Sequence, residues 1–353
     1  MEPRMFYYYQ SPRESAGAFS PFVPLKAKFA NKYIVERMSA TEYPNLYVSD
    51  DLKEFRAVTA LEPQKKFKWY STELCHWRLP DNMTAAGVLY KPENFDPQKK
   101  YPVIFFYYER YSAALNNYIH PDLSTGVMNI PWFVSNGYLV FVPDIYYIDG
   151  YPGRSALNSI VSAAHFLSKR SYLDSNHMGL HGHSFGGFET NYIVSRTAIF
   201  AAAATSDGES DLIGAYGYAS RYYEQGQGRM GATLWSSFDR YAENSSISRA
   251  NKVTTPILIL HNREDRIVPV AQGQEWYNDL SHAGKRVWML SYNSEDHDIH
   301  KVVNQLDYSI RLSQFFNHFL KGAPPPKWMT KVVNSGVGGI ESSLELDNSG
   351  GTP

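Results

Sequence analysis

The chain has 353 residues, of which 43% are hydrophobic and 20% are charged, a composition that excludes intrinsic disorder over most of its length. Its 34 lysines and arginines balance 35 aspartates and glutamates, so no overall positive charge is available to bind nucleic acid or an anionic membrane. One cysteine, Cys75, excludes an internal disulfide and a thiolate metal cluster, and no apolar run is long enough to span a bilayer.

The N-terminal segment, residues 1–65, is predicted to be rich in β structure. Short β-prone runs lie at residues 33–37, 45–48 and 55–59, each bounded by turn-forming residues. Three short strands cannot bury both of their faces. We therefore expect this segment to pack on another part of the molecule or to be the remainder of a larger β domain.

Residues 66–322 alternate between predicted strands and helices. Strands are expected at residues 84–90 (as an edge strand), 101–108, 138–142, 177–181, 200–204, 256–260 and 286–292. Helices are expected at residues 132–136, 155–169, 185–196, 271–283 and 301–320. This alternation predicts a mainly parallel, doubly wound α/β sheet. Residues 323–353 form a tail that has three prolines at residues 324–326 and is predicted to be disordered from residue 335.

The sharpest local motif is the sequence Gly-His-Ser-Phe-Gly-Gly at residues 182–187. It is a G-x-S-x-G pattern between a predicted strand and a predicted helix, where a tight turn would raise the Ser184 hydroxyl above the sheet. Small residues are needed on both sides because backbone and helix crowd such a turn. The motif predicts that Ser184 is a nucleophile.

A serine nucleophile needs a base, and the base needs an acid that orients it. In this type of fold the acid and then the histidine follow the serine along the chain. Asp265 and His297 each follow a predicted strand, so they are expected at the same sheet edge as Ser184. Glu264 is an alternative acid, and His300 is an alternative base that is expected to face the following helix.

The developing oxyanion needs two hydrogen-bond donors. The turn after residues 101–108 has no pair of glycines to supply a backbone donor, so we expect the hydroxyl of Tyr108 to serve, together with the N–H of Phe185. The alternative is that Tyr108 is only a core aromatic residue.

Other reactive side chains have simpler interpretations. His181, His183 and His261 form a conceivable metal group, but no further ligand lies at metal spacing, so neither a metal nor another cofactor is predicted. His183 is expected to have a packing role. Cys75 is expected to be a buried structural thiol.

Taken together, these motifs resemble the prolyl oligopeptidase family of serine peptidases, in particular its bacterial dipeptidyl peptidase IV-like and acylaminoacyl peptidase-like branch. The resemblance covers about residues 33–329 and rests on residues 89–95, 99–102, 182–187, 231–235, 261–269, 295–299 and 320–329. It implies an α/β-hydrolase fold with the Ser184–Asp265–His297 triad. In this family a β-propeller precedes the hydrolase domain, and residues 33–65 resemble the end of one.

The chain departs from the family pattern at a few positions. Phe185, Asn262 and Asp298 stand where the family has Tyr or Trp, Gly, and Gly respectively. By resemblance, residues 205–211 line the pocket for the substrate side chain, and they contain three acids. These acids would favour a basic substrate residue, but a solvated loop is the interpretation that we prefer from the sequence.

The predicted function is that of a serine peptidase that hydrolyses short peptides through an acyl-enzyme. The alternatives are an esterase or thioesterase on the same fold, or a non-catalytic interaction protein with a vestigial site. The expected partner is a peptide substrate; a homodimer and a missing N-terminal propeller are left open. No signal-peptide core follows Met1. The compartment would be periplasmic or secreted for a piece of a longer, signal-bearing precursor, and cytoplasmic otherwise.

Overall fold

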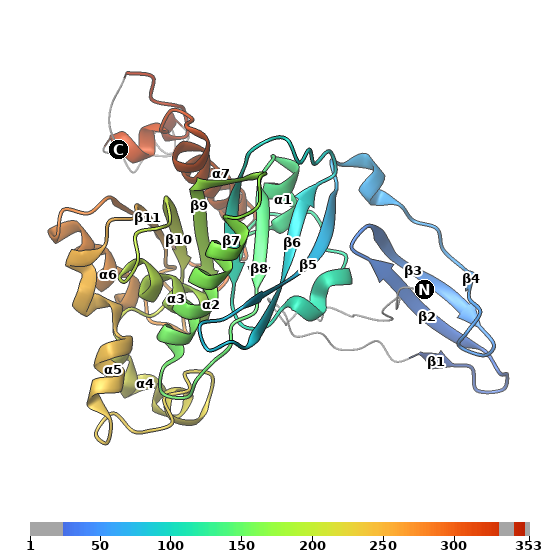
Figure 1. The fold of residues 1–353 in the computed structure, drawn as a ribbon, viewed down its shortest axis with the longest axis horizontal. Coiled ribbons are helices and arrows are strands. Elements are labelled where there is room, and N and C mark those ends of the chain that lie inside the picture. The colour runs from blue at the N-terminus through green and yellow to red at the C-terminus, as the bar shows by residue number, and fades with distance from the viewer. Residues whose placement is uncertain (1–23, 332–341, 350–353) are drawn as a thin grey trace.

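The computed structural model describes residues 24–331 and 342–349, and an eight-stranded sheet organises most of them (Figure 1). The strand order is β12-β11-β10-β9-β7-β8-β6-β5. The strands from β12 to β8 are parallel, and β6 is antiparallel to both of its neighbours. The bounds are β5 Tyr70–Arg78, β6 Thr84–Pro92, β7 Tyr101–Tyr107, β8 Leu139–Pro143, β9 Leu173–His183, β10 Ala202–Ser206, β11 Ile257–Leu260 and β12 Val287–Leu290.

Helices cover both faces of this sheet (Figure 1). Their bounds are α1 Ile130–Ser135, α2 Pro152–Leu167, α3 Phe185–Val194, α4 Leu212–Gln225, α5 Phe238–Asn244, α6 Ala271–His282, α7 Val302–Lys321 and α8 Lys327–Thr330, with 3-10 turns at Pro63–Lys66, Ser112–Asn116 and Ser246–Lys252.

Alternate residues of β7 show how the two faces are filled. Phe105 belongs to the core formed with α2, α3 and α6, whereas Ile104 and Phe106 belong to the core formed with α1 and α7. A strand that is buried on both faces has a nearly continuous apolar sequence, as predicted for this segment. The layers and strand order are those of the α/β-hydrolase fold, which confirms the predicted fold class.

The edge of the sheet differs from the prediction. The strand predicted at residues 84–90 is β6, but it is not an edge strand, because the unpredicted strand β5 pairs along its whole length. In β5 the side chains of Cys75 and Trp77 are buried while those of Leu74 and His76 are exposed. This alternation is typical of a strand with one face in water, and it was the signal that could have revealed β5.

Two further helices, α4 and α5, were not predicted. They pack over α3 and share with it a separate apolar cluster that includes Leu212, Tyr223, Tyr241, Phe185 and Phe188. Five glycines and many tyrosines in residues 212–231 obscure the helical period of this segment. As a result, a small helical layer covers the region beyond the carboxyl ends of the strands, next to Ser184.

A second, four-stranded antiparallel sheet precedes the main sheet and lies to one side of it (Figure 1). Its strands, in spatial and chain order, are β1 Leu25–Lys26, β2 Tyr33–Ser39, β3 Glu42–Ser49 and β4 Arg56–Ala57. The indole of Trp69 donates a hydrogen bond to the carbonyl oxygen of Ala40 at 2.8 Å, and the amide of Gln64 donates to that of Thr41 at 3.2 Å. These bonds attach the β2–β3 turn to the main body.

Part of the tail departs from the disorder predicted from residue 335. Residues 342–349 fold back on α7 and α8. The Thr330 hydroxyl donates to Asp347 at 2.6 Å, and the Gln314 amide donates to the Leu344 carbonyl at 2.6 Å. These polar contacts, together with the packing of Leu344 against the core beside α7, hold the segment in place. Residues 1–23, 332–341 and 350–353, also included in predictions above, lie outside the described residues. Within residues 24–331 and 342–349, no helix combines the length and apolarity needed to cross a membrane.

Candidate active site

The predicted turn at Ser184 lies between the end of β9 and the start of α3. Ser184 has φ 56° and ψ −120°, a backbone conformation that non-glycine residues rarely adopt. A Cβ atom on Gly182 would collide with the carbonyl of Gly186, and one on Gly186 would lie 2.5 Å from the carbonyl oxygen of Tyr107. The two glycines are therefore required by the close approach of the backbone, and they allow the serine to project from a strained turn.

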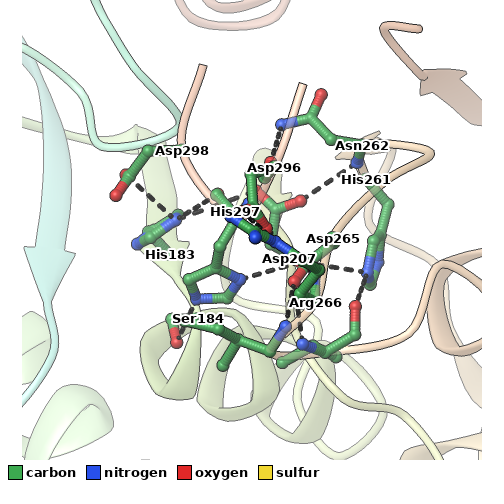
Figure 2. Close-up of polar contacts among 12 residues, drawn as sticks. His183, Ser184, Asp207, His261, Asn262, Asp265, Arg266, Asp296, His297 and Asp298 are labelled. Atoms are coloured by element: carbon green, nitrogen blue, oxygen red, sulfur yellow. Dashed lines mark hydrogen bonds and ion pairs between the residues drawn. The ribbon is translucent and has the colours of Figure 1, made fainter. Parts of the chain in front are cut away.

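Ser184, His297 and Asp265 form one chain of hydrogen bonds (Figure 2). The Nε2 atom of His297 lies 2.8 Å from the Ser184 hydroxyl oxygen, and its Nδ1 atom lies 2.8 Å from Oδ2 of Asp265. His297 comes from the loop after β12 and Asp265 from the loop after β11. The structure thus brings together the three side chains that were predicted from the motif, the chain order and the strand ends.

The alternative acid and base are not part of this chain. The side chains of Glu264 and His300 are exposed, whereas Asp265 and His297 are each only 8% exposed. The Oδ1 atom of Asp265 accepts hydrogen bonds from the backbone N–H groups of Ile267 and Val268, both at 2.8 Å. These bonds fix the carboxylate so that Oδ2 faces His297.

The pKa of His297 reflects two opposing effects. Burial alone would lower it, but the hydrogen bond and negative charge of Asp265, aided by the charges of Asp207 and Asp298, raise this pKa to about 8. The imidazolium form is thus stabilised, as is useful for a base that must hold a proton during a reaction.

A further set of bonds ties together the two loops that carry His297 and Asp265. Arg266 pairs with the carboxylate of Asp296, which also accepts from the His297 backbone N–H at 2.9 Å (Figure 2). The side chain of Asn262 donates to the Asp296 carbonyl at 2.8 Å. Asn262, noted above as a departure from the family pattern, therefore has a structural role that sequence reasoning missed.

The three histidines considered as metal ligands are used differently. His181 bonds to the Tyr308 hydroxyl at 3.3 Å, and His261 lies 2.9 Å from the Val268 carbonyl oxygen. His183 is buried beneath His297, with its Nε2 atom 3.2 Å from the His297 carbonyl oxygen. Burial lowers the pKa of His183 to about 4, so this ring is neutral at ordinary pH.

One group of possible ligand side chains does come together, and it differs from the predicted one. Within residues 24–331 and 342–349, Asp207, His261 and Asp265 approach one another closely enough to surround an ion. Asp265 is already engaged by His297 and by two backbone N–H groups. We therefore interpret this cluster as support for His297.

Tyr108 lies beside Ser184, in a cavity of about 350 Å³ that both residues line with His297. Its hydroxyl donates to the Gln227 side-chain oxygen at 3.2 Å, and burial raises its pKa despite hydrogen-bonding contact with Gln227 and Ser184. Tyr107 points to the opposite face, where its hydroxyl lies 2.8 Å from that of Thr190. Phe185 is the first residue of α3, so its N–H has no acceptor within the helix.

The acidic stretch after β10 is not a solvated loop, contrary to our preferred interpretation. Asp207 and Glu209 are 0% and 5% exposed, and only Asp211 has the ordinary role of capping α4. Asp207 accepts from the Asn262 backbone N–H at 3.1 Å, and Glu209 lines the same cavity as Ser184. Their position directly after a strand that leads to the site was the signal that could have identified them.

Cys75 lies in β5, four strands away from the β9 strand that leads to Ser184. Burial raises the pKa of its thiol to about 12, so the reactive thiolate is disfavoured.

Comparison with known proteins decides the family. The model of the prolyl oligopeptidase family matches residues 125–323, more than half of the chain. The chain belongs to the prolyl oligopeptidase family. This is a family of serine peptidases, and the matched residues include Ser184, Asp265 and His297.

Relatives of this family member carry peptidase names. This chain is 25% identical over 244 residues to a protein of Aspergillus terreus described as a probable dipeptidyl-peptidase 5. The alignment covers 65% of this chain and 33% of that one. A dipeptidyl-peptidase 5 of Porphyromonas endodontalis is also 25% identical, over 66% of this chain and 35% of that one. The chain thus spans about a third of the length of these relatives.

A solved structure supports the fold. The acylaminoacyl peptidase of Pyrococcus horikoshii aligns with a TM-score of 0.65 at 20% identity, covering 89% of this chain and 50% of that one. At this identity, the likeness is evidence for the shared α/β-hydrolase architecture.

Proposed function

We propose that this chain is the catalytic part of a serine peptidase that hydrolyses short peptides through an acyl-enzyme. The observation that carries the proposal is the hydrogen-bonded chain from Ser184 through His297 to Asp265, with 2.8 Å at each step. Ser184 is the nucleophile, His297 is the general base and acid, and Asp265 orients and stabilises the imidazolium. Family membership supports peptide rather than ester substrates.

In the proposed reaction, the Ser184 oxygen attacks the peptide carbonyl while the Nε2 atom of His297 accepts the serine proton. The tetrahedral intermediate collapses as His297 gives that proton to the leaving amine, and the acyl group stays on Ser184. Water then attacks the ester with His297 again acting as the base, which releases the acid and restores the serine.

The negative oxygen of the intermediate is stabilised by the Phe185 N–H and the Tyr108 hydroxyl. The position of Phe185 at the N-terminus of α3 supports its role, because the free N–H groups and the helix dipole there favour negative charge. The position of Tyr108 in the same cavity as Ser184 supports the second role.

A direct comparison of substrates tests this proposal. Short peptide anilides and matched acyl esters are assayed side by side on the same preparation. Hydrolysis of the anilides supports a peptidase. Hydrolysis of esters alone would favour the esterase or thioesterase, and hydrolysis of neither would favour the non-catalytic alternative.

Replacing Tyr108 by phenylalanine removes one oxyanion donor and retains the ring. We expect kcat to fall about 10²–10³-fold, the usual loss for one such donor, with little change in KM, because the bond strengthens mainly in the transition state. Steady-state kinetics measure this effect, and Tyr107→Phe is the matched control, because Tyr107 points to the opposite face of β7. Equal, small losses in the two variants would mean that Tyr108 is only a packing residue.

Replacing Asp265 by asparagine should be far more damaging than Glu264→Gln. An amide at position 265 cannot stabilise the imidazolium of His297, so we expect kcat/KM to fall on the order of 10⁴-fold. Because Glu264 is exposed, Glu264→Gln should leave kcat/KM within a factor of about two of the wild-type value, as is typical of a surface substitution. A larger loss in Glu264→Gln than in Asp265→Asn would mean that Asp265 is not the acid that orients His297.

The activity should depend on pH through His297, because only the neutral imidazole accepts the Ser184 proton. With a raised pKa of about 8, we expect kcat/KM to increase with pH up to about 8 and then to level off. In Asp265→Asn, the loss of the neighbouring charge should move this transition to lower pH. An unchanged transition in that variant would show that another group titrates.

We also propose that β1–β4 derive from a β-propeller blade. Four antiparallel strands in sequence order are what one blade contains, and a closed propeller needs several such sheets. The mass of the protein isolated from its natural source tests this idea. A native polypeptide long enough to hold several further blades would assign β1–β4 to a complete propeller, whereas a native mass equal to that of these 353 residues would assign them to a truncated relative.

A further inference from the structure

Glu209 has an unusual position for a carboxyl group. It is 5% exposed, yet it lines the cavity of about 350 Å³ that contains Ser184 and His297. One carboxyl oxygen accepts a hydrogen bond from the Tyr223 hydroxyl at 3.1 Å, whereas the other, Oε2, is buried and has no hydrogen-bond partner among the described residues. An unsatisfied buried carboxylate oxygen is costly, so it points to a ligand that completes it.

His297 acts on Glu209 with a positive charge only while its imidazole is protonated. No lysine or arginine is among the described residues that line this cavity, and Arg229, which donates to the backbone of the lining residue Gln227, is already paired with Glu109 at 2.7 Å. Tyr108 and Tyr222 contribute aromatic rings to the cavity. A carboxylate flanked by aromatic rings is a combination that favours ammonium and guanidinium groups.

Glu209 is also held in place. Its backbone carbonyl accepts from the side chain of the buried Asn191 at 3.1 Å, and its own side chain is fixed by Tyr223. Burial raises the pKa of Glu209, and an entering cation would restore its charged form. The acid therefore lies within the cavity at a defined position relative to the nucleophile.

We propose that Glu209 determines specificity by binding a cationic group on the substrate residue whose carbonyl Ser184 attacks. This inference rests on the proposed function, because it uses the same cavity and the same attacking serine. The cation has two sources, namely a basic side chain or the free α-amino group of that residue. Both present N–H donors and a positive charge to the Glu209 carboxylate.

Matched fluorogenic amides separate these sources. Acetyl-arginine amide is compared with acetyl-citrulline amide, which has the same shape without the charge, and the citrulline amide is assayed with and without its acetyl group. We expect the wild-type chain to prefer one cationic member of these pairs at least tenfold in kcat/KM. Preference for arginine assigns the side chain, and preference for the free amine assigns the α-amino group.

Glu209→Gln keeps the size of the side chain and should abolish that preference by a selective loss on the cationic substrate. Glu264→Gln removes the same charge from an exposed position outside the cavity and should retain the preference. The assignment is overturned if the wild-type enzyme hydrolyses the neutral amides as well as the cationic ones. It is also overturned if the preference for a cationic amide is unchanged in Glu209→Gln. In both cases the proposed peptidase function stands.

Binding to the Ser184→Ala protein tests the same inference without any reaction. Titration calorimetry compares acetyl-arginine, arginine and citrulline amides, with and without the Glu209→Gln substitution. Glu209-dependent binding of a cationic amide supports the cation site even if no amide is hydrolysed, an outcome that would count against the proposed function alone. Binding that ignores both the charge and Glu209 contradicts the site.

Discussion

Ser184→Ala is expected to lower kcat for peptide anilides on the order of 10⁴-fold or more, with little change in KM. The substitution removes the only atom that forms the acyl bond in the proposed reaction, and the remaining groups can only orient substrate and water. Alanine has the same backbone restrictions as serine, so the turn at φ 56° should be kept. Steady-state kinetics with a thermal unfolding scan separate lost chemistry from lost folding.

Ser294→Ala is a matched control for this substitution. Ser294 is also a serine with positive φ, at 60°, but its side chain is exposed and outside the hydrogen-bonded chain. The Ser294→Ala protein should therefore stay active. If Ser184→Ala retained most of its activity, the nucleophile would have to be sought elsewhere.

His297→Ala is expected to match Ser184→Ala in severity. Without the imidazole, no group accepts the serine proton or delivers it to the leaving amine, and residues that act as one unit show losses that do not add. The double variant Ser184→Ala/His297→Ala should therefore be scarcely worse than either single variant. The measurement is kcat for the three proteins on one anilide.

His300→Ala is the control for this second substitution, because His300 lies on the same loop with an exposed side chain. It is expected to retain activity. A severe loss in His300→Ala together with a mild one in His297→Ala would reverse the assignment of the base.

Several features of this site could be predicted because they depend on local chemistry. The G-x-S-x-G pattern marked the turn at Ser184, since only glycine fits where the Gly186 backbone meets Tyr107. Strand ends placed Asp265 and His297 at one edge of the sheet, because parallel strands end together. The alternation of side chains in β7 also separated Tyr107 from Tyr108 correctly.

The features that were missed depend on tertiary burial. Glu209 and Asp207 look like residues of a solvated loop, and only the packing of α4 over α3 removes them from water. Similarly, Asn262 shows its role only when the loop of Asp296 lies beside it. Strand β5 was overlooked because its apolar residues cover one face only, which is a weaker pattern than that of the buried β7.

Labelling with a fluorophosphonate tests the central claim most directly, because the reagent forms a bond only with an activated serine. The modified residue is located by peptide mass mapping. We predict one adduct, on Ser184, whose rate of formation increases with pH up to the His297 pKa of about 8 and which is absent from His297→Ala. An adduct on another serine, or no adduct on the folded protein, would contradict the account.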